Sequence, residues 1–200
     1  MSNKMNKCIK KHKNSFISSI LTLMLVLIMT GCSTAPTHLI LAPEITKAPN
    51  YSYVDTQATL NVIDMRTSNH VVQILKEGKA ANILSSRQRL DKLITNVLTD
   101  AWKKQGVQFS QLSSTKINIS IDKAITSVTQ KTMTYSTQSE IIITLKIITT
   151  QQTLTNTFKS RGNSEGVLTA DIAVLERDFN QSLNSLLTQI INSEDVNSFL

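Results

Sequence analysis

The sequence predicts an α+β domain, a two-layer sandwich in which two amphipathic helices cover one face of a mainly antiparallel sheet. Residues 85–105 and 169–191 carry apolar side chains at the three- and four-residue spacing of a helix with one buried face. Other segments alternate apolar and polar residues, which is typical of strands covered on one side. Packing these apolar faces against one another forms a single core.

Two strands are expected before the first helix, at residues 57–66 and 70–76. In the first, Ala58, Leu60 and Val62 occupy alternate positions, the two-residue period of a strand. The second ends where Glu77-Gly78-Lys79 breaks the chain.

The first helix, residues 85–105, is expected to begin at a capping box formed by Ser85 and Gln88 and to end before Gly106. Residues 106–109 then return the chain to the sheet. Trp102 is assigned to the core because it continues the apolar stripe of this helix. The stripe consists of Leu90, Leu93, Ile94, Val97, Leu98, Ala101 and Trp102.

Three further strands are expected at residues 116–129, 134–150 and 153–160, with a turn at residues 161–164. The second helix, residues 169–191, is expected to start at an N-cap on Thr169. The tail after it is polar apart from Val196, Phe199 and Leu200.

The N-terminal 31 residues have the pattern of a secretory signal peptide. Five lysines precede a charge-free stretch of 14 residues, 16–29, and small residues follow it. The alternative is a transmembrane anchor. A 14-residue helix spans roughly 21 Å, short of the ~30 Å hydrocarbon core, so we favour the cleaved signal.

The residues that end this stretch, Met29-Thr30-Gly31-Cys32, resemble the lipobox at which lipoprotein signal peptidase cuts. The resemblance implies cleavage between Gly31 and Cys32 and lipidation of Cys32, with diacylglyceryl and acyl chains that attach the protein to a membrane. Ser33 stands where an aspartate would resemble the inner-membrane retention signal. We therefore expect the outer membrane, facing the periplasm, rather than the inner membrane.

The expected mature chain divides into a Pro-containing tether at residues 32–53 and a single domain at residues 54–200. The apolar run Leu39-Ile40-Leu41 is a segment of the tether that can dock on the domain. Loss of the signal peptide leaves 16 basic against 14 acidic residues, so the net charge of +7 falls to about +2. A chain this close to neutral has no concentrated basic face, so nucleic acid is not an expected partner.

The order of elements and several local sequences resemble the YajG family of outer-membrane lipoproteins. The resemblance runs from the lipobox through residues 56–200. It implies a location and a fold, and no biochemical activity. The residues that carry it are Asp64-Met65-Arg66, Arg89-Leu90, Glu165-Gly166, Leu183-Asn184-Ser185-Leu186-Leu187 and Phe199-Leu200.

No pattern of a catalytic, metal or cofactor site occurs, so we expect neither an enzyme nor a bound metal or cofactor. The leading hypothesis is a non-catalytic interaction or accessory subunit that binds another envelope protein. Asp64, Arg66, Phe199 and Leu200 are the candidate interaction surface; a surface ion pair is the alternative interpretation of Asp64 and Arg66. The second hypothesis is a periplasmic binding module for a small molecule, glycan or lipid, which requires a pocket between helices and sheet.

Overall fold

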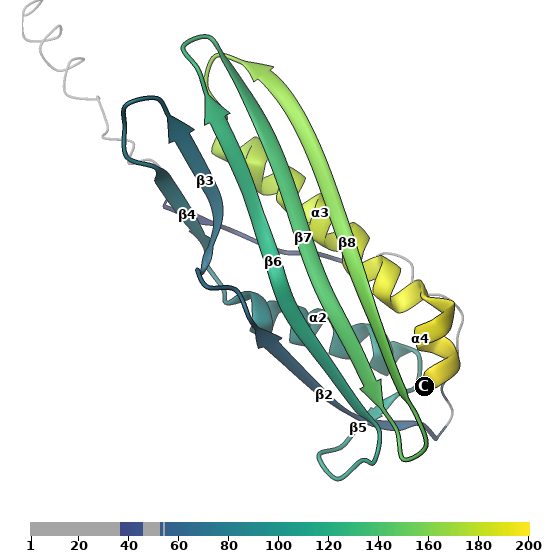
Figure 1. Ribbon diagram of the computed structural model, residues 1–200. Helices are drawn as coiled ribbons and strands as arrows, with labels where there is room; N and C mark the ends of the chain where they lie inside the picture. Colours follow the sequence, from purple (N-terminus) through teal and green to yellow (C-terminus); the bar gives the residue numbers. More distant parts are fainter. Residues whose placement is uncertain (1–36, 46–52, 54) are drawn as a thin grey trace, which may run out of the picture. The chain divides into compact units, whose positions relative to one another are not determined.

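A computed structural model describes residues 37–45, 53 and 55–200, which lie in one compact unit, Pro36–Leu200. The unit is an α+β domain with a strand-rich, curled sheet, as the sequence predicts for the fold class (Figure 1). Its elements are β1 (His38–Leu39), β2 (Gln57–Asp64), β3 (His70–Lys76), β4 (Asn82–Ser86), α2 (Leu90–Lys104), β5 (Gln108–Phe109), β6 (Lys116–Gln130), β7 (Thr134–Ile148), β8 (Thr153–Val167), α3 (Ile172–Asn192) and α4 (Glu194–Phe199).

The long strand β6 organises the sheet because different strands pair with its two edges. Along one edge it forms an antiparallel pair with β7, which in turn pairs with β8. Its other edge is shared: β2 pairs with residues 116–121 and β3 with residues 126–130, both parallel to β6. The predicted sheet was mainly antiparallel, and the observed sheet mixes three long antiparallel strands with this parallel pairing.

A bulge lies where β6 changes partner. The register between β6 and β7 shifts between Ile121 and Lys123. Buried positions before the shift include Ile119 and Ile121, and those after it include Ala124 and Thr126, so the inward side changes from odd to even residue numbers. One extra residue in a strand has this effect, because side chains alternate between faces.

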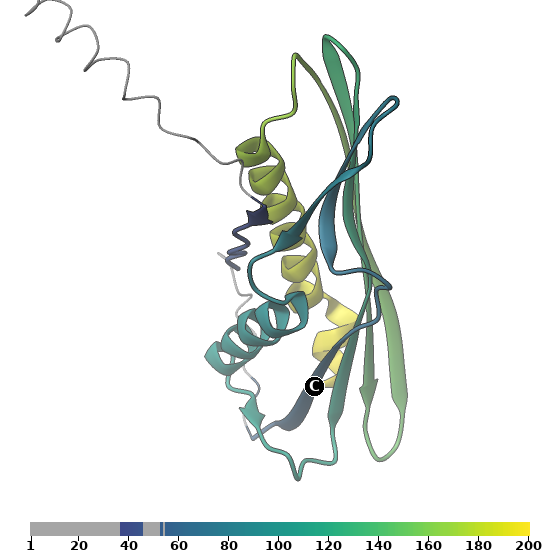
Figure 2. The ribbon, with the colours of Figure 1, turned by 90° about the vertical axis from the view of Figure 1, so that its left-hand side faces the viewer.

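The helices lie on one side of the sheet (Figure 2). Helix α2 packs on β2 and β5, while α3 packs on β7 and β8 and contacts both other helices. Trp102 of α2 and Phe179 of α3 are fully buried in one core with the inward residues of the strands, which confirms the assignment of Trp102. Gly106 ends α2 with φ +102°, and a Cβ there would lie 3.1 Å from the Tyr53 carbonyl oxygen.

Several predicted boundaries were wrong because polar residues also join an element where they pair or pack with a neighbouring part of the chain. The predicted turn at residues 161–164 is part of β8, which stays in register with β7 throughout. Residues 82–86, whose last two were assigned to the first helix, form β4 against β3. Three helices are present among the described residues instead of two, since the polar tail forms α4.

Both predicted helix caps were also wrong. Helix α2 starts at Leu90, and its N-cap residue Arg89 makes no side-chain capping hydrogen bond. In α3 the cap is Asp171 rather than Thr169, because the Asp171 carboxylate accepts the backbone N–H of Ala173 at 2.9 Å. Each helix therefore begins later in the chain than its predicted cap, at Leu90 and at Ile172.

Candidate functional site

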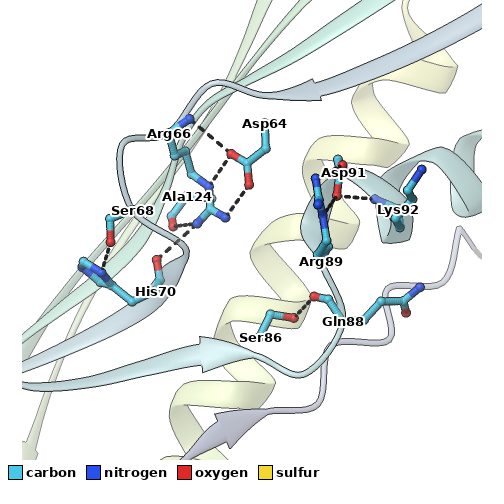
Figure 3. A network of polar contacts seen from close by, with 10 residues as sticks. All are labelled: Asp64, Arg66, Ser68, His70, Ser86, Gln88, Arg89, Asp91, Lys92 and Ala124. Carbon is cyan, nitrogen blue, oxygen red and sulfur yellow. Dashed lines mark hydrogen bonds and ion pairs between the residues drawn. The ribbon is translucent and has the colours of Figure 1, made fainter.

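The gap between β2 and β3 along β6 is closed by the side chain of Arg66 (Figure 3). Its Nη1 donates to the carbonyl oxygens of His70 and Ala124, both at 3.2 Å. Its Nε and Nη2 donate to the Asp64 carboxylate at 2.9 and 2.8 Å. Ala124 lies in the stretch of β6 that neither β2 nor β3 pairs with, so the guanidinium replaces a missing strand partner.

The geometry leaves little of this ion pair on the surface. The Arg66 and Asp64 side chains are 7% and 14% exposed. The guanidinium fork matches the carboxylate in two parallel hydrogen bonds, an arrangement that holds both groups rigidly. Asp64 and Arg66, two residues of the candidate interaction surface, therefore bond to each other and to neighbouring strands of the same domain.

A second arginine–aspartate pair stands beside the first, at the start of α2 (Figure 3). Arg89 donates to Asp91 through Nε at 3.0 Å and Nη2 at 2.7 Å. The hydrogen bond from Arg89 lowers the pKa of Asp91, and the same contact raises the pKa of Arg89. The Arg89 side chain is 76% exposed and the Asp91 side chain 11%, so in this pair the arginine is open to water and the carboxylate is not.

The two pairs border a polar hollow of about 480 Å³. Its charged lining consists of Arg66, Arg87, Arg89 and Asp64, with Asn69 and residues 85–88 completing the wall. No nucleophile stands beside a base and an orienting acid here, the arrangement that acyl transfer requires. His70 contacts Ser68 on the exposed side of the loop, and no group of three or more His, Cys, Asp or Glu in the described ranges is arranged to hold a metal.

Phe199 and Leu200, the other candidate surface residues, are half-buried against the core. Thr56 donates its hydroxyl to the Leu200 carbonyl oxygen at 3.1 Å, and Tyr53 donates its hydroxyl to Asn197 in α4. The tail therefore packs on the domain. Gly31 and Cys32, the predicted cleavage and lipidation site, lie outside the described residues.

The described part of the predicted tether docks on the domain through the apolar run that the sequence singled out. Strand β1 pairs with β4, and Leu39 and Leu41 are buried. The backbone N–H of Ile40 donates to Glu176 at 2.6 Å, and that of Ala42 donates to Asn180 at 2.9 Å. Residues 37–45 are thus attached to α3 and β4.

The strands of the sheet form two further surfaces. Strand β8 is an edge strand of 15 residues, and no other described strand pairs with its outer side. At the end of the sheet where β3, β6 and β8 finish, several large apolar side chains are exposed. They are Leu75 (42%), Ile83 (57%), Met133 (64%), Val167 (75%) and Leu168 (60%).

Residues 43–200 match a family model described as an uncharacterized lipoprotein, Lipoprotein_16. This chain belongs to that family. The match confirms the resemblance to the YajG lipoproteins, and it supports association of this lipoprotein with the cell envelope. In the described part of the chain, no helix is both long and apolar enough to cross a membrane.

The fold is shared with a solved protein of Xanthomonas campestris that is assigned to family DUF330. The two chains superpose with a TM-score of 0.60 at 14% identity, over 82% of this chain and 97% of the other. A second solved structure, of an uncharacterized protein, has a TM-score of 0.36 at 14% identity, over 80% of this chain and 100% of the other. No curated protein matches this lipoprotein.

Proposed function

We propose that this lipoprotein is a non-catalytic interaction protein, anchored by lipid on Cys32 to the periplasmic face of the outer membrane. It serves as an accessory subunit that binds another envelope protein. We interpret its fold as a two-layer sandwich in which α2 and α3 cover one face of the sheet. This arrangement leaves the edge strand β8 free to receive a partner.

The open edge of β8 is the observation that carries the proposal. Thr149 donates its N–H to the Gln152 carbonyl oxygen, and Leu168 donates its N–H to the Met133 carbonyl oxygen. Even-numbered residues of β8 therefore direct their backbone N–H and C=O groups at β7, and odd-numbered residues of β8 direct theirs outward. An extended segment of another protein can add to this row as a further strand.

In-cell photo-crosslinking tests the proposal directly. A photoreactive residue at Lys159, an exposed odd-numbered position of β8, should crosslink to a defined envelope protein. The same group at Leu112, which is 96% exposed in the loop before β6, is the control. The substitution Lys159→Pro removes an outward N–H and should abolish the crosslink from a neighbouring odd position, whereas Lys159→Ser should keep it. No crosslink from any odd position would refute strand addition.

The anchor and its location need separate experiments. Cys32→Ala should abolish incorporation of labelled palmitate and release the protein from the membrane fraction. Ser33→Asp should move the lipidated protein from the outer to the inner membrane. If Ser33→Asp leaves the distribution unchanged, the assignment to the outer membrane loses its basis.

The alternative is a periplasmic binding module for a small molecule, glycan or lipid. The polar hollow bounded by Arg66, Arg87 and Arg89 is the observation that favours it. An anionic ligand suits three guanidinium groups, although Asp64 and Asp91 already pair with two of them. Arg87→Ala, which leaves both ion pairs intact, should abolish such binding and should leave the β8 crosslinks unchanged.

A further inference from the structure

One row of paired residues marks the exposed apolar end of the sheet. Lys76 of β3, Gln130 of β6, Tyr135 of β7 and Gly166 of β8 are paired in one row across four strands. Beyond this row lie the β3–β4 turn, the β6–β7 turn and the end of β8. We call this part of the molecule, residues 77–81, 131–134 and 167–168, the tip (Figure 1).

The apolar residues of the tip are held in place rather than left loose. Gln130, which is 7% exposed, donates through Nε2 to the carbonyl oxygens of Leu168 at 2.7 Å and Lys131 at 2.8 Å. Its Oε1 accepts the N–H of Ala170 at 3.1 Å. Leu168 has φ +66°, a conformation that is strained for a branched side chain, and yet it points a 60% exposed side chain at solvent. Such strain persists where the surrounding structure imposes it, and it often marks a functional position.

The composition of the tip suits the interface of a phospholipid bilayer. Met133, Val167 and Leu168 supply apolar side chains, and the ring of Tyr135 lies over Gly166 just behind them. Lys76, Lys79 and Lys131 line one hollow at the same end of the sheet, and long lysine side chains suit contact with lipid phosphates. Glu77 and Glu165 also lie at this end, so net charge contributes little and the apolar residues carry the attachment.

The direction in which β1 runs also indicates the tip. Strand β4 is antiparallel to β3 and so runs away from the tip, and β1 is parallel to β4. Followed backward from Leu39, the residues of β1 therefore head toward the tip. The contacts with α3 agree, because Ala42 meets Asn180 and Ile40 meets Glu176, nearer the start of that helix.

The length of chain before β1 matches the distance to the tip. His38 is level with Ser85 and His70, and six residues of β3 separate His70 from the row that contains Lys76. Six residues of strand span about 20 Å. Cys32 precedes His38 by six residues, which span at most about 20–22 Å when extended. Six residues are therefore enough chain for a lipid on Cys32 to reach the level of the tip, and not enough for it to reach much farther.

We propose that the tip is a membrane-docking surface: Met133, Val167 and Leu168 insert into the headgroup region of the phospholipid leaflet that holds the anchor. This inference rests on lipidation of Cys32, as proposed above. The lipid and the tip together then give two points of attachment, which fix the orientation of the domain and direct the opposite end of the sheet away from the membrane.

Fluorescence of the lipidated protein in vesicles of phosphatidylethanolamine and phosphatidylglycerol tests this proposal. The expected mature chain has no cysteine besides Cys32, so Met133→Cys or Val167→Cys accepts a single environment-sensitive fluorophore. Leu112→Cys is the matched control, since Leu112 is a 96% exposed apolar residue in the loop before β6, at the other end of the sheet. We expect a blue-shifted emission and quenching by nitroxide-labelled lipid at residues 133 and 167, and neither effect at residue 112.

The other outcomes distinguish a failure of docking by the tip from a failure of the lipid anchor. Vesicle flotation first establishes that the protein is membrane-bound. Bound protein whose probe at residue 133 behaves like the probe at residue 112 overturns docking by the tip and leaves the anchor intact. A blue shift without quenching by lipid also overturns it, because the tip then contacts protein. Failure to float refutes the anchor and, with it, the argument for the tip.

Discussion

Replacing Arg66 with methionine tests whether one side chain holds the two halves of the β6 edge together. The substitution keeps an unbranched apolar stem and removes four hydrogen bonds, two to the Asp64 carboxylate and one each to the carbonyl oxygens of His70 and Ala124. It leaves the 14% exposed carboxylate of Asp64 without its cation. Removing one member of a buried ion pair destabilises a protein by about 3–5 kcal/mol, and we expect a loss in this range.

The assay is urea denaturation of the mature chain with Cys32→Ser, which contains the whole compact unit. The control is Arg177→Met, because Arg177 pairs with Asp178 at the surface, where the two side chains are 70% and 38% exposed. Surface pairs of this kind contribute little to stability, so the control should change the midpoint only slightly. A loss for Arg66→Met no larger than that for Arg177→Met, at an unchanged denaturant slope, would refute the role assigned to Arg66.

Three further variants test other parts of the structure in the same assay. Leu39→Ala should destabilise the domain by about 2–5 kcal/mol because Leu39 is fully buried, whereas Ile40→Ala, at a 57% exposed position, should change stability by about 0.5 kcal/mol or less; equal effects would contradict docking of β1. Asp171→Ala should cost about 1 kcal/mol as the loss of the α3 cap, and Thr169→Ala should show no comparable loss. Hydrogen bonds from Lys123 and Arg161 lower the pKa of Glu140 from 4.5 to about 2, so the carboxylate stabilises the fold fully above pH 4.5 and loses this effect as the pH falls toward 2. Glu140→Gln should therefore be less stable than the parent at pH 7, and the two should converge near pH 2; a constant difference would show that the charge is not responsible.

The features predicted correctly from sequence are those with a strong local signal. The apolar stripes of the two long helices and the burial of Trp102 follow from periodicity, because an element with one buried face repeats its apolar residues at its own period. The end of β3 follows from the chain break at Glu77-Gly78-Lys79. The return of the chain after Gly106 follows from a backbone conformation that glycine readily adopts. The resemblance to a lipoprotein family likewise depended on residues in sequence order.

Features decided by neighbours in space were predicted less well. Residues 161–164 are polar and contain a glycine, yet they are strand because β7 provides a continuous partner. Strand β4 exists because β3 pairs with it, and its residues carry no period that separates them from the helix that follows. The tail becomes α4 because Val196 finds a place in the core.

Asp64 and Arg66 illustrate the same division. A surface ion pair was one of two interpretations of these residues from sequence, and the structure shows an ion pair whose side chains are only 14% and 7% exposed. Whether the pair faces a partner or closes a gap depends on which carbonyl groups lack a hydrogen-bond donor, and this depends on how β2 and β3 share β6. Local periodicity records which face of an element is buried; the pairing of distant strands, which only the tertiary structure sets, decides what each polar side chain contacts.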